Sequence, residues 1–133
     1  MDCPVDIIFV VDESGSIGAR NFNMMRLFLS HLVSRLDVDT GITRVGIVTF
    51  SSNVGTVINL RDHSSVSSLQ SAILSLVYSG GGTNTARALA YVRTTMLTSA
   101  AGDRSNVSNI VAVVTDGHSN NFQATVVSMN LLV

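Results

Sequence analysis

A carboxylate and two hydroxyls follow directly after an apolar run near the start of the chain. In "VVDESGSIG" the apolar run ends at Asp12, and Ser14 and Ser16 follow at alternate positions with Gly15 between them. Only 13% of the residues are charged, so a carboxylate at the end of an apolar segment needs an explanation. Side chains of these types can bind a hard cation, or they can cap a following helix.

Two other segments carry side chains of the same kind. "VVTDG" ends a second apolar run at Asp116, and "SGGGTNT" is a glycine-rich loop with several hydroxyls. Ligand sites in open α/β sheets lie at the carboxyl ends of the strands, so we expect the three segments to meet at one rim. Their donor atoms are all oxygen, which hard cations such as magnesium prefer, whereas metals that favour thiolate or imidazole have little support.

The hydrophobic pattern predicts the elements that position these loops. Apolar, β-branched runs predict strands, and apolar residues spaced by three and four predict helices. The predicted strands are 5–11, 44–50, 57–60 and 109–115, and the predicted helices are 18–36, 65–77, 85–97 and 122–131. Strands that alternate with helices predict an α/β fold with a doubly wound, mostly parallel sheet, in a single domain over residues 1–133.

The predicted sheet has four strands in the order third, second, first, fourth. The third strand, 57–60, is expected to be antiparallel and to form one edge. Since residues 122–131 read as a helix, the outer edge of the strand at 109–115 is expected to be open. An open apolar edge invites pairing with other chains.

Composition excludes several classes of function. The net charge is −1 and the pI about 6.2, which gives no electrostatic basis for binding nucleic acid or inserting into an anionic membrane. The apolar runs are shorter than the roughly 20 residues that span a bilayer.

Three local features bear on processing and modification. "MDCPVDIIFVVD" has neither the basic region nor the cleavage site of a signal peptide. The single cysteine, Cys3, cannot form an internal disulfide, and Asn106 begins a glycosylation sequon.

The segments "DIIFVVDESGSIG", "GGGTNT" and "VVTDG" resemble, in this order and spacing, a von Willebrand factor type A domain. The similarity extends to "RVGIVTFSS" and "ALAYV" and covers nearly the whole chain. It implies a Rossmann-like fold and a metal ion-dependent adhesion site (MIDAS). Carried over residue by residue, the ligands would be Asp12, Ser14, Ser16, Thr83 and Asp116.

The resemblance also implies a function. The ion would be Mg²⁺ or Mn²⁺, with one coordination position left for a carboxylate of a partner protein. Among its relatives the chain looks most like the extracellular members of collagens, matrilins and related proteins. It would therefore be a secreted, non-enzymatic module that binds an extracellular matrix or adhesion protein presenting an acidic residue.

The chain departs from the family pattern at its end. The family continues through further helices and two more strands after the "TDG" segment, whereas sixteen residues follow Gly117. We therefore expect a fold that is incomplete on the C-terminal side. The closing cysteine that would pair with Cys3 is absent from this chain.

Other interpretations stay open at this stage. Asp12, Ser14 and Ser16 could be plain helix caps. Ser14 or Ser16 could act with His118 in a serine hydrolase, although no G-x-S-x-G motif is present. The chain could also be a structural fragment without a competent site. Glu13 is expected to be solvated.

Overall fold

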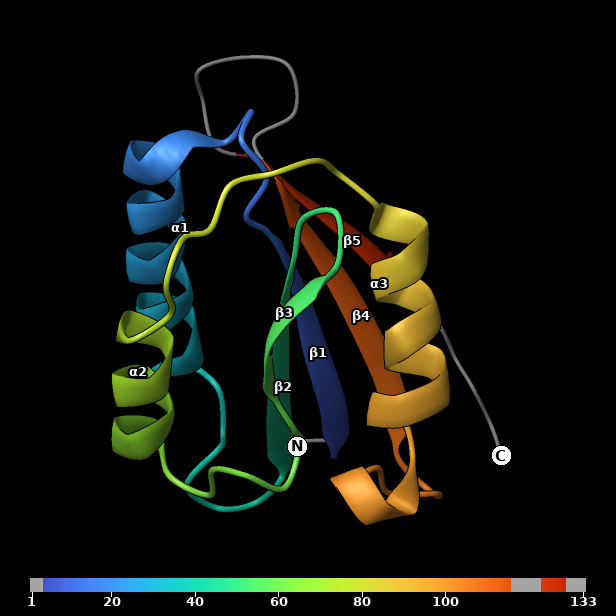
Figure 1. Cartoon of the computed structure of the whole chain (residues 1–133). Helices are drawn as coiled ribbons and strands as arrows, with labels where there is room; N and C mark the ends of the chain where they lie inside the picture. The colour runs from blue at the N-terminus through green and yellow to red at the C-terminus, as the bar shows by residue number, and fades with distance from the viewer. Residues whose placement is uncertain (1–3, 116–122, 129–133) are drawn as a thin grey trace.

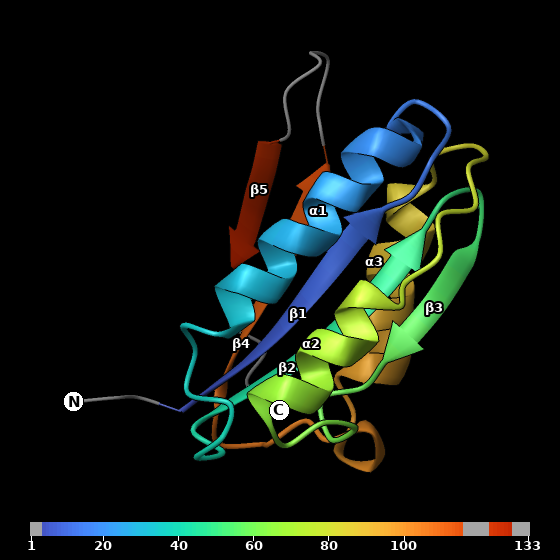
Figure 2. The ribbon, with the colours of Figure 1, turned by 90° about the vertical axis from the view of Figure 1, so that its left-hand side faces the viewer.

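The computed structural model describes residues 4–115 and 123–128, and it contains a mixed sheet with helices on both faces (Figures 1 and 2). Helices α1 and α2 cover one face and α3 covers the other. The elements in chain order are β1 Val5–Asp12, α1 Gly18–Val33, β2 Thr43–Phe50, β3 Val54–Ile58, α2 Val66–Leu74, α3 Thr85–Tyr91, the π-helical turn η1 Val92–Met96, the 3₁₀ turn η2 Ser99–Ala101, β4 Ser108–Thr115 and β5 Gln123–Ser128. The predicted α/β class is confirmed.

The five strands lie in the order β3-β2-β1-β4-β5. Strand β1 is parallel to β2 and to β4, and β3 is antiparallel to β2. The predicted order of the first four strands is therefore confirmed, as is the antiparallel edge strand. Because β1 lies between β2 and β4, the chain switches direction across the sheet at β1, which is where open α/β sheets bind ligands.

The expectations for residues after β4 are wrong. Residues 123–128 form a strand, not part of a helix, and β5 pairs antiparallel with β4, with Ala112 opposite Val126. The β4 edge that was expected to be open is thus paired. Thr125, Val126 and Val127 are β-branched and favour an extended backbone. Pairing also satisfies the backbone groups along β4, which outweighs the weak helical spacing in so short a segment.

Several element boundaries also differ from the prediction. Helix α1 ends at Val33 and α2 at Leu74, each three residues earlier than predicted. The predicted third helix changes to a π-helical turn at Val92. Strand β3 begins at Val54, inside a segment predicted to be a turn. No helix in the part of the chain that the structure describes is long and apolar enough to cross a membrane.

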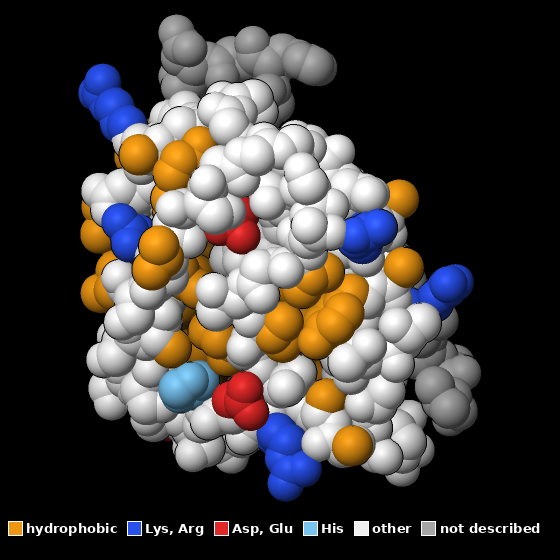
Figure 3. Space-filling view, viewed as in Figure 1, with side chains coloured by type: hydrophobic (Ala, Val, Ile, Leu, Met, Phe, Trp, Pro, Cys, Tyr) orange, Lys and Arg blue, Asp and Glu red, His pale blue; other side chains and the backbone are white. Residues whose placement is uncertain are grey.

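The core consists of two apolar clusters, one on each face of the sheet. Phe9 and Val11 of β1 face α1 and α2, whereas Ile8 and Val10 face α3. This explains why β1 is apolar at successive positions, as an interior parallel strand should be. On the face drawn in Figure 3, apolar side chains gather between β3 and α3, and charged side chains lie scattered.

A partly buried ion pair ties the start of β1 to the segment before β4. The Asp6 side chain is fully buried, and its Oδ1 accepts hydrogen bonds from Arg104 Nε and Nη2 at 2.9 and 2.7 Å. The Arg104 backbone N–H donates to the other carboxylate oxygen at 2.9 Å. Burial, together with the negative charge of Asp6, raises the pKa of the neighbouring Asp103 carboxyl above its usual value.

Gly102 is required where two loops meet at this end of the sheet. Its φ is +110°, and a Cβ there would lie 2.6 Å from the Arg61 backbone N. We predict that Gly102→Ala lowers the free energy of unfolding by about 3 kcal/mol, because strain and overpacking add. Gly41→Ala is the matched control, since Gly41 has a φ of +82° but nothing within 4 Å of a Cβ.

Urea denaturation of both variants measures this difference. Gly41→Ala carries the backbone strain alone and is expected to cost about 1 kcal/mol. Equal losses for the two variants would contradict the close approach of Gly102 to Arg61.

Candidate functional site

Asp12, Ser14 and Ser16 lie together where β1 ends. The Asp12 side chain is 4% exposed and its Oδ1 accepts a hydrogen bond from the Ser14 backbone N–H at 2.8 Å. This bond turns the backbone so that the two serine hydroxyls approach, with their oxygens 3.1 Å apart. Ser14 is buried and Ser16 is exposed, so the pair runs from the interior to the surface.

The interpretation of these side chains as helix caps is wrong. Helix α1 begins at Gly18, and its N-cap is Ile17, with no side-chain capping hydrogen bond. The hydrogen bond between Ser14 Oγ and Ser16 Oγ joins the two hydroxyls to each other instead. A different explanation is therefore needed for three oxygen-bearing side chains at this position.

The glycine-rich loop is joined to this turn by a reciprocal pair of backbone hydrogen bonds. Gly15 N–H donates to Gly81 O at 2.8 Å, and Gly80 N–H donates to Glu13 O at 3.0 Å. Gly81 has a φ of +106°, a conformation that glycine adopts without a steric penalty. The Tyr78 hydroxyl adds a third bond, donating to Ser14 O at 3.0 Å.

The other side of the glycine-rich loop is held by the turn between β2 and β3. Gly82 N–H donates to Ser52 Oγ at 3.0 Å, and Asn84 N–H donates to Ser51 O at 2.8 Å. Thr83 lies between these two anchored residues, with its side chain exposed. In Figure 1 the loop passes beside the turn that follows β1. The structure thus places Thr83 on the same rim as the two serines.

Asp116 and Cys3, two other residues singled out from the sequence, lie outside the described residues. Thr115, the residue before Asp116, ends β4. Val114 is aligned with Val11 of β1, so the two strands end at the same rim. Four of the five predicted ligands can therefore be placed in the structure, and the fifth follows a strand that ends beside Asp12.

The hydroxyl pair fits a small divalent cation. Adjacent ligands of an octahedral ion, each about 2.1 Å from it, lie about 3.0 Å apart. The 3.1 Å between Ser14 Oγ and Ser16 Oγ matches that spacing. The described residues contain no group of three or more histidine, cysteine or acidic side chains that could hold a metal ion. Any ion here would thus rely on hydroxyls together with a few carboxylates.

Glu13 and Tyr78 are features that the sequence prediction missed or misjudged. Glu13 is buried rather than solvated, at 3% exposure. A Cβ at Gly55 of β3 would overlap its carboxylate, so the Glu13 side chain fills the space that glycine leaves. Tyr78 directly precedes the "SGGG" segment. An aromatic hydroxyl beside a glycine-rich loop is the sequence feature that could have indicated its hydrogen bond to the turn after β1.

The described residues contain no serine–histidine pair at this rim. His31 is exposed on α1, and His63 lies at the opposite end of the sheet, where its Nδ1 is 2.6 Å from Ser68 Oγ. The serine hydrolase interpretation therefore depends on His118, which lies outside the described residues.

Comparison with known proteins places the chain in a family. The family profile described as "von Willebrand factor type A domain" matches residues 6–131. The chain belongs to this family. The von Willebrand factor type A fold agrees with the observed strand order, with the mostly parallel sheet and with helices on both faces.

Individual relatives point to the same group of proteins. The chain is 42% identical over 118 residues to the mouse (Mus musculus) collagen alpha-4(VI) chain and 39% identical over 117 residues to mouse matrilin-1. These matches cover 87% and 86% of this chain but only 5% and 23% of the two relatives. Both relatives are extracellular matrix proteins.

A solved structure supplies a metal-bound relative. Proximal thread matrix protein 1 from the mussel byssus, with zinc in its MIDAS motif, superposes with a TM-score of 0.80 at 30% identity. The match covers 90% of this chain and 32% of that one. A related von Willebrand factor type A domain thus binds a divalent metal at its MIDAS motif.

The Tyr78 hydroxyl is predicted to stabilise the turn at 12–16. Tyr78→Phe removes the hydrogen bond to Ser14 O, which should cost about 1 kcal/mol of unfolding free energy. It should also speed amide hydrogen exchange at Gly15 and Gly80. Tyr91→Phe, in α3, is the matched control and should change neither quantity. Unchanged exchange at Gly15 in Tyr78→Phe would contradict this role.

Proposed function

We propose that this domain binds a partner protein through a divalent metal ion, Mg²⁺ or Mn²⁺. Asp12, Ser14, Ser16 and Thr83 would hold the ion together with Asp116. When bound, the ion would supply a Lewis-acid position for a carboxylate of the partner. The domain would act as a non-enzymatic adhesion module, since binding requires no bond to be broken.

The observation that carries this proposal is the 3.1 Å separation of the two serine hydroxyls beside a buried carboxylate. Capping of α1 does not account for them, because the N-cap Ile17 has no side-chain hydrogen bond. A cluster of polar side chains that caps no helix, and that lies at the switch point of the sheet, favours a ligand site. The zinc-bound relative supports a metal as that ligand.

The chain's own residues prepare the site before any ion arrives. The bonds between residues 13–15 and 80–81 fix the backbone around Ser14. The Tyr78 hydroxyl donates to the Ser14 carbonyl, which holds the backbone of the same turn at a third point. A site ordered in this way loses little conformational entropy on binding, which favours affinity.

We further propose an extracellular setting and an acidic partner. The relatives are extracellular matrix proteins, and a partner carboxylate is the natural ligand for a hard cation. Asn106 is exposed before β4, at the end of the sheet away from the proposed metal site. The eight residues of β4 separate the two by roughly 25 Å, so a glycan on Asn106 would leave the site accessible.

Metal binding is tested by calorimetric titration with magnesium and manganese. The parent domain is expected to bind both, and at 100 times the dissociation constant the ion should add about 2.7 kcal/mol of stability. Asp12→Ala should abolish binding while helix content is retained. Asp37→Ala, which removes an exposed carboxylate far from the rim, is the control and should bind like the parent. Equal binding by Asp12→Ala would overturn the proposal.

Recognition of a carboxylate is tested with a short peptide whose C-terminus is amidated and whose only carboxylate is that of one glutamate. In the presence of Mg²⁺, amide resonances of Ser14, Ser16 and Thr83 should shift as the peptide is added. The same peptide with glutamine should cause no such shifts, because its neutral amide is a weaker ligand for a hard cation. Shifts that persist in excess chelator would show that the peptide binds independently of metal and would refute this mode of recognition.

A further inference from the structure

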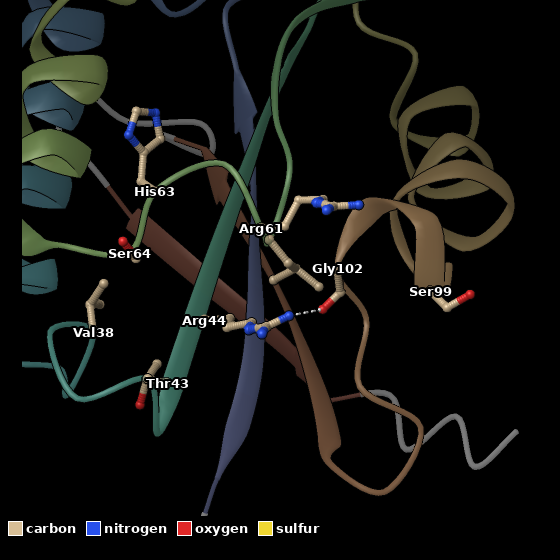
Figure 4. Close-up of a pocket in the computed structure, with 10 residues that line it drawn as sticks. Val38, Thr43, Arg44, Arg61, His63, Ser64, Ser99 and Gly102 are labelled. Carbon is tan, nitrogen blue, oxygen red and sulfur yellow. Dashed lines mark hydrogen bonds between the residues drawn. The ribbon is translucent and has the colours of Figure 1, made fainter.

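A cavity of about 430 Å³ lies at the end of the sheet opposite the proposed metal site. Figure 4 shows it where β2 begins, between the segment after β3 and the turn that contains η2. Its polar lining consists of two arginines, one histidine and three hydroxyls: Arg44, Arg61, His63, Thr43, Ser64 and Ser99. None of the described residues that line it is acidic.

The two arginines are held in place by the same turn. Arg44 Nη1 donates to Gly102 O at 2.9 Å, and Arg61 Nη1 donates to Ala100 O at 2.8 Å. In Figure 4 both side chains extend from their own strand or loop toward this turn. The close packing of Gly102 against the Arg61 backbone fixes the distance between the two loops. Each guanidinium has five N–H donors, so one bond to a carbonyl orients it and leaves others for a ligand.

Within residues 4–115 and 123–128, neither arginine of the cavity forms an ion pair with a carboxylate. Among the described residues the one ion pair is Asp6–Arg104, which involves neither arginine of the cavity. Two acidic side chains on the surrounding loops are engaged with backbone: Asp39 Oδ1 accepts from Val66 N, and Asp62 Oδ2 accepts from Asn59 N. The described lining therefore offers positive charge and N–H donors, which favour an anion.

We propose that this cavity binds a tetrahedral oxyanion, the sulfate or phosphate group of a larger molecule. The guanidinium fork matches the oxygen geometry of such groups, and the hydroxyls of Thr43, Ser64 and Ser99 can supply further hydrogen bonds. The cavity has the size of a small-molecule site and exceeds one oxyanion, which leaves room for the group that carries it.

The cavity is independent of the metal site. Thr43 begins β2 and Phe50 ends it, so the eight residues of this strand separate the two sites by roughly 25 Å. Both sites can therefore be occupied at once. A partner bound at the metal rim and a sulfated or phosphorylated molecule bound at the cavity would contact opposite ends of the domain.

The test uses the full chain in excess chelator, so that its outcome does not depend on the metal site. Inorganic sulfate, inorganic phosphate and a sulfated disaccharide are titrated while amide resonances are followed. Saturable shifts at Thr43, Arg61 and Gly102 are expected. Arg44→Gln and Arg61→Gln should each weaken binding about tenfold or more, as expected for the loss of a charge-assisted hydrogen bond.

Control variants separate a built site from general charge attraction. Arg93→Gln removes an exposed positive charge from η1, outside the cavity, and should bind like the parent. Arg44→Lys keeps the charge but loses the planar fork, and should bind more weakly than the parent. Urea midpoints confirm that each variant is folded.

The probes also distinguish the source of the oxyanion. If the sulfated disaccharide binds more tightly than inorganic sulfate, the natural ligand is a sulfated glycan. If inorganic phosphate binds more tightly than both sulfate probes, the natural ligand carries a phosphate group. Either result supports the site. The absence of saturable shifts overturns the proposal. So does an equal loss of affinity in Arg93→Gln and Arg44→Gln, because binding would then follow net charge alone.

Discussion

The candidate metal site depends on two backbone hydrogen bonds between segments more than sixty residues apart in the sequence. Gly15 N–H to Gly81 O and Gly80 N–H to Glu13 O join the turn after β1 to the loop before α3. Together with the bond from the Tyr78 hydroxyl to Ser14 O, this reciprocal pair fixes where the loop that carries Thr83 lies relative to Ser14. Gly80 and Gly81 have φ of +75° and +106°, a backbone conformation that glycine adopts without a steric penalty. The conformation that the loop needs to reach Glu13 and Gly15 therefore explains these two glycines.

The sheet supplies the rigid base for that pair of loops. Strand β1 is buried on both faces and hydrogen-bonded on both sides, so Asp12 at its end has little freedom to move. The ion pair between buried Asp6 and partly exposed Arg104 fixes the other end of the same strand. The domain thus presents two differently built ends. One has oxygen donors suited to a cation, and the other has oriented arginines suited to an anion.

The first four strands and their order could be predicted from the sequence, because the hydrophobic pattern of each segment agrees with its place in the sheet. Consecutive apolar residues identified β1 and β4 as interior strands, and the predicted strand order brought the carboxyl ends of these two strands to one rim. The strand β5 was not predictable in the same way, because its pairing depends on the free edge of β4 rather than on its own pattern. The burial of Glu13 and the hydrogen bond from the Tyr78 hydroxyl to Ser14 O were also not predictable from the sequence pattern. Both arise from contacts between residues far apart in the sequence, which local spacing does not encode.

The central claim is that the hydroxyls of Ser14 and Ser16 are preorganised ligands of one divalent ion. The most direct measurement is the anomalous diffraction of manganese in crystals of the domain. The account predicts a single strong peak about 2.1 Å from both hydroxyl oxygens, with the backbone of residues 12–16 and 80–84 unchanged on binding. A peak at another place, or binding only after the two loops separate, would contradict it.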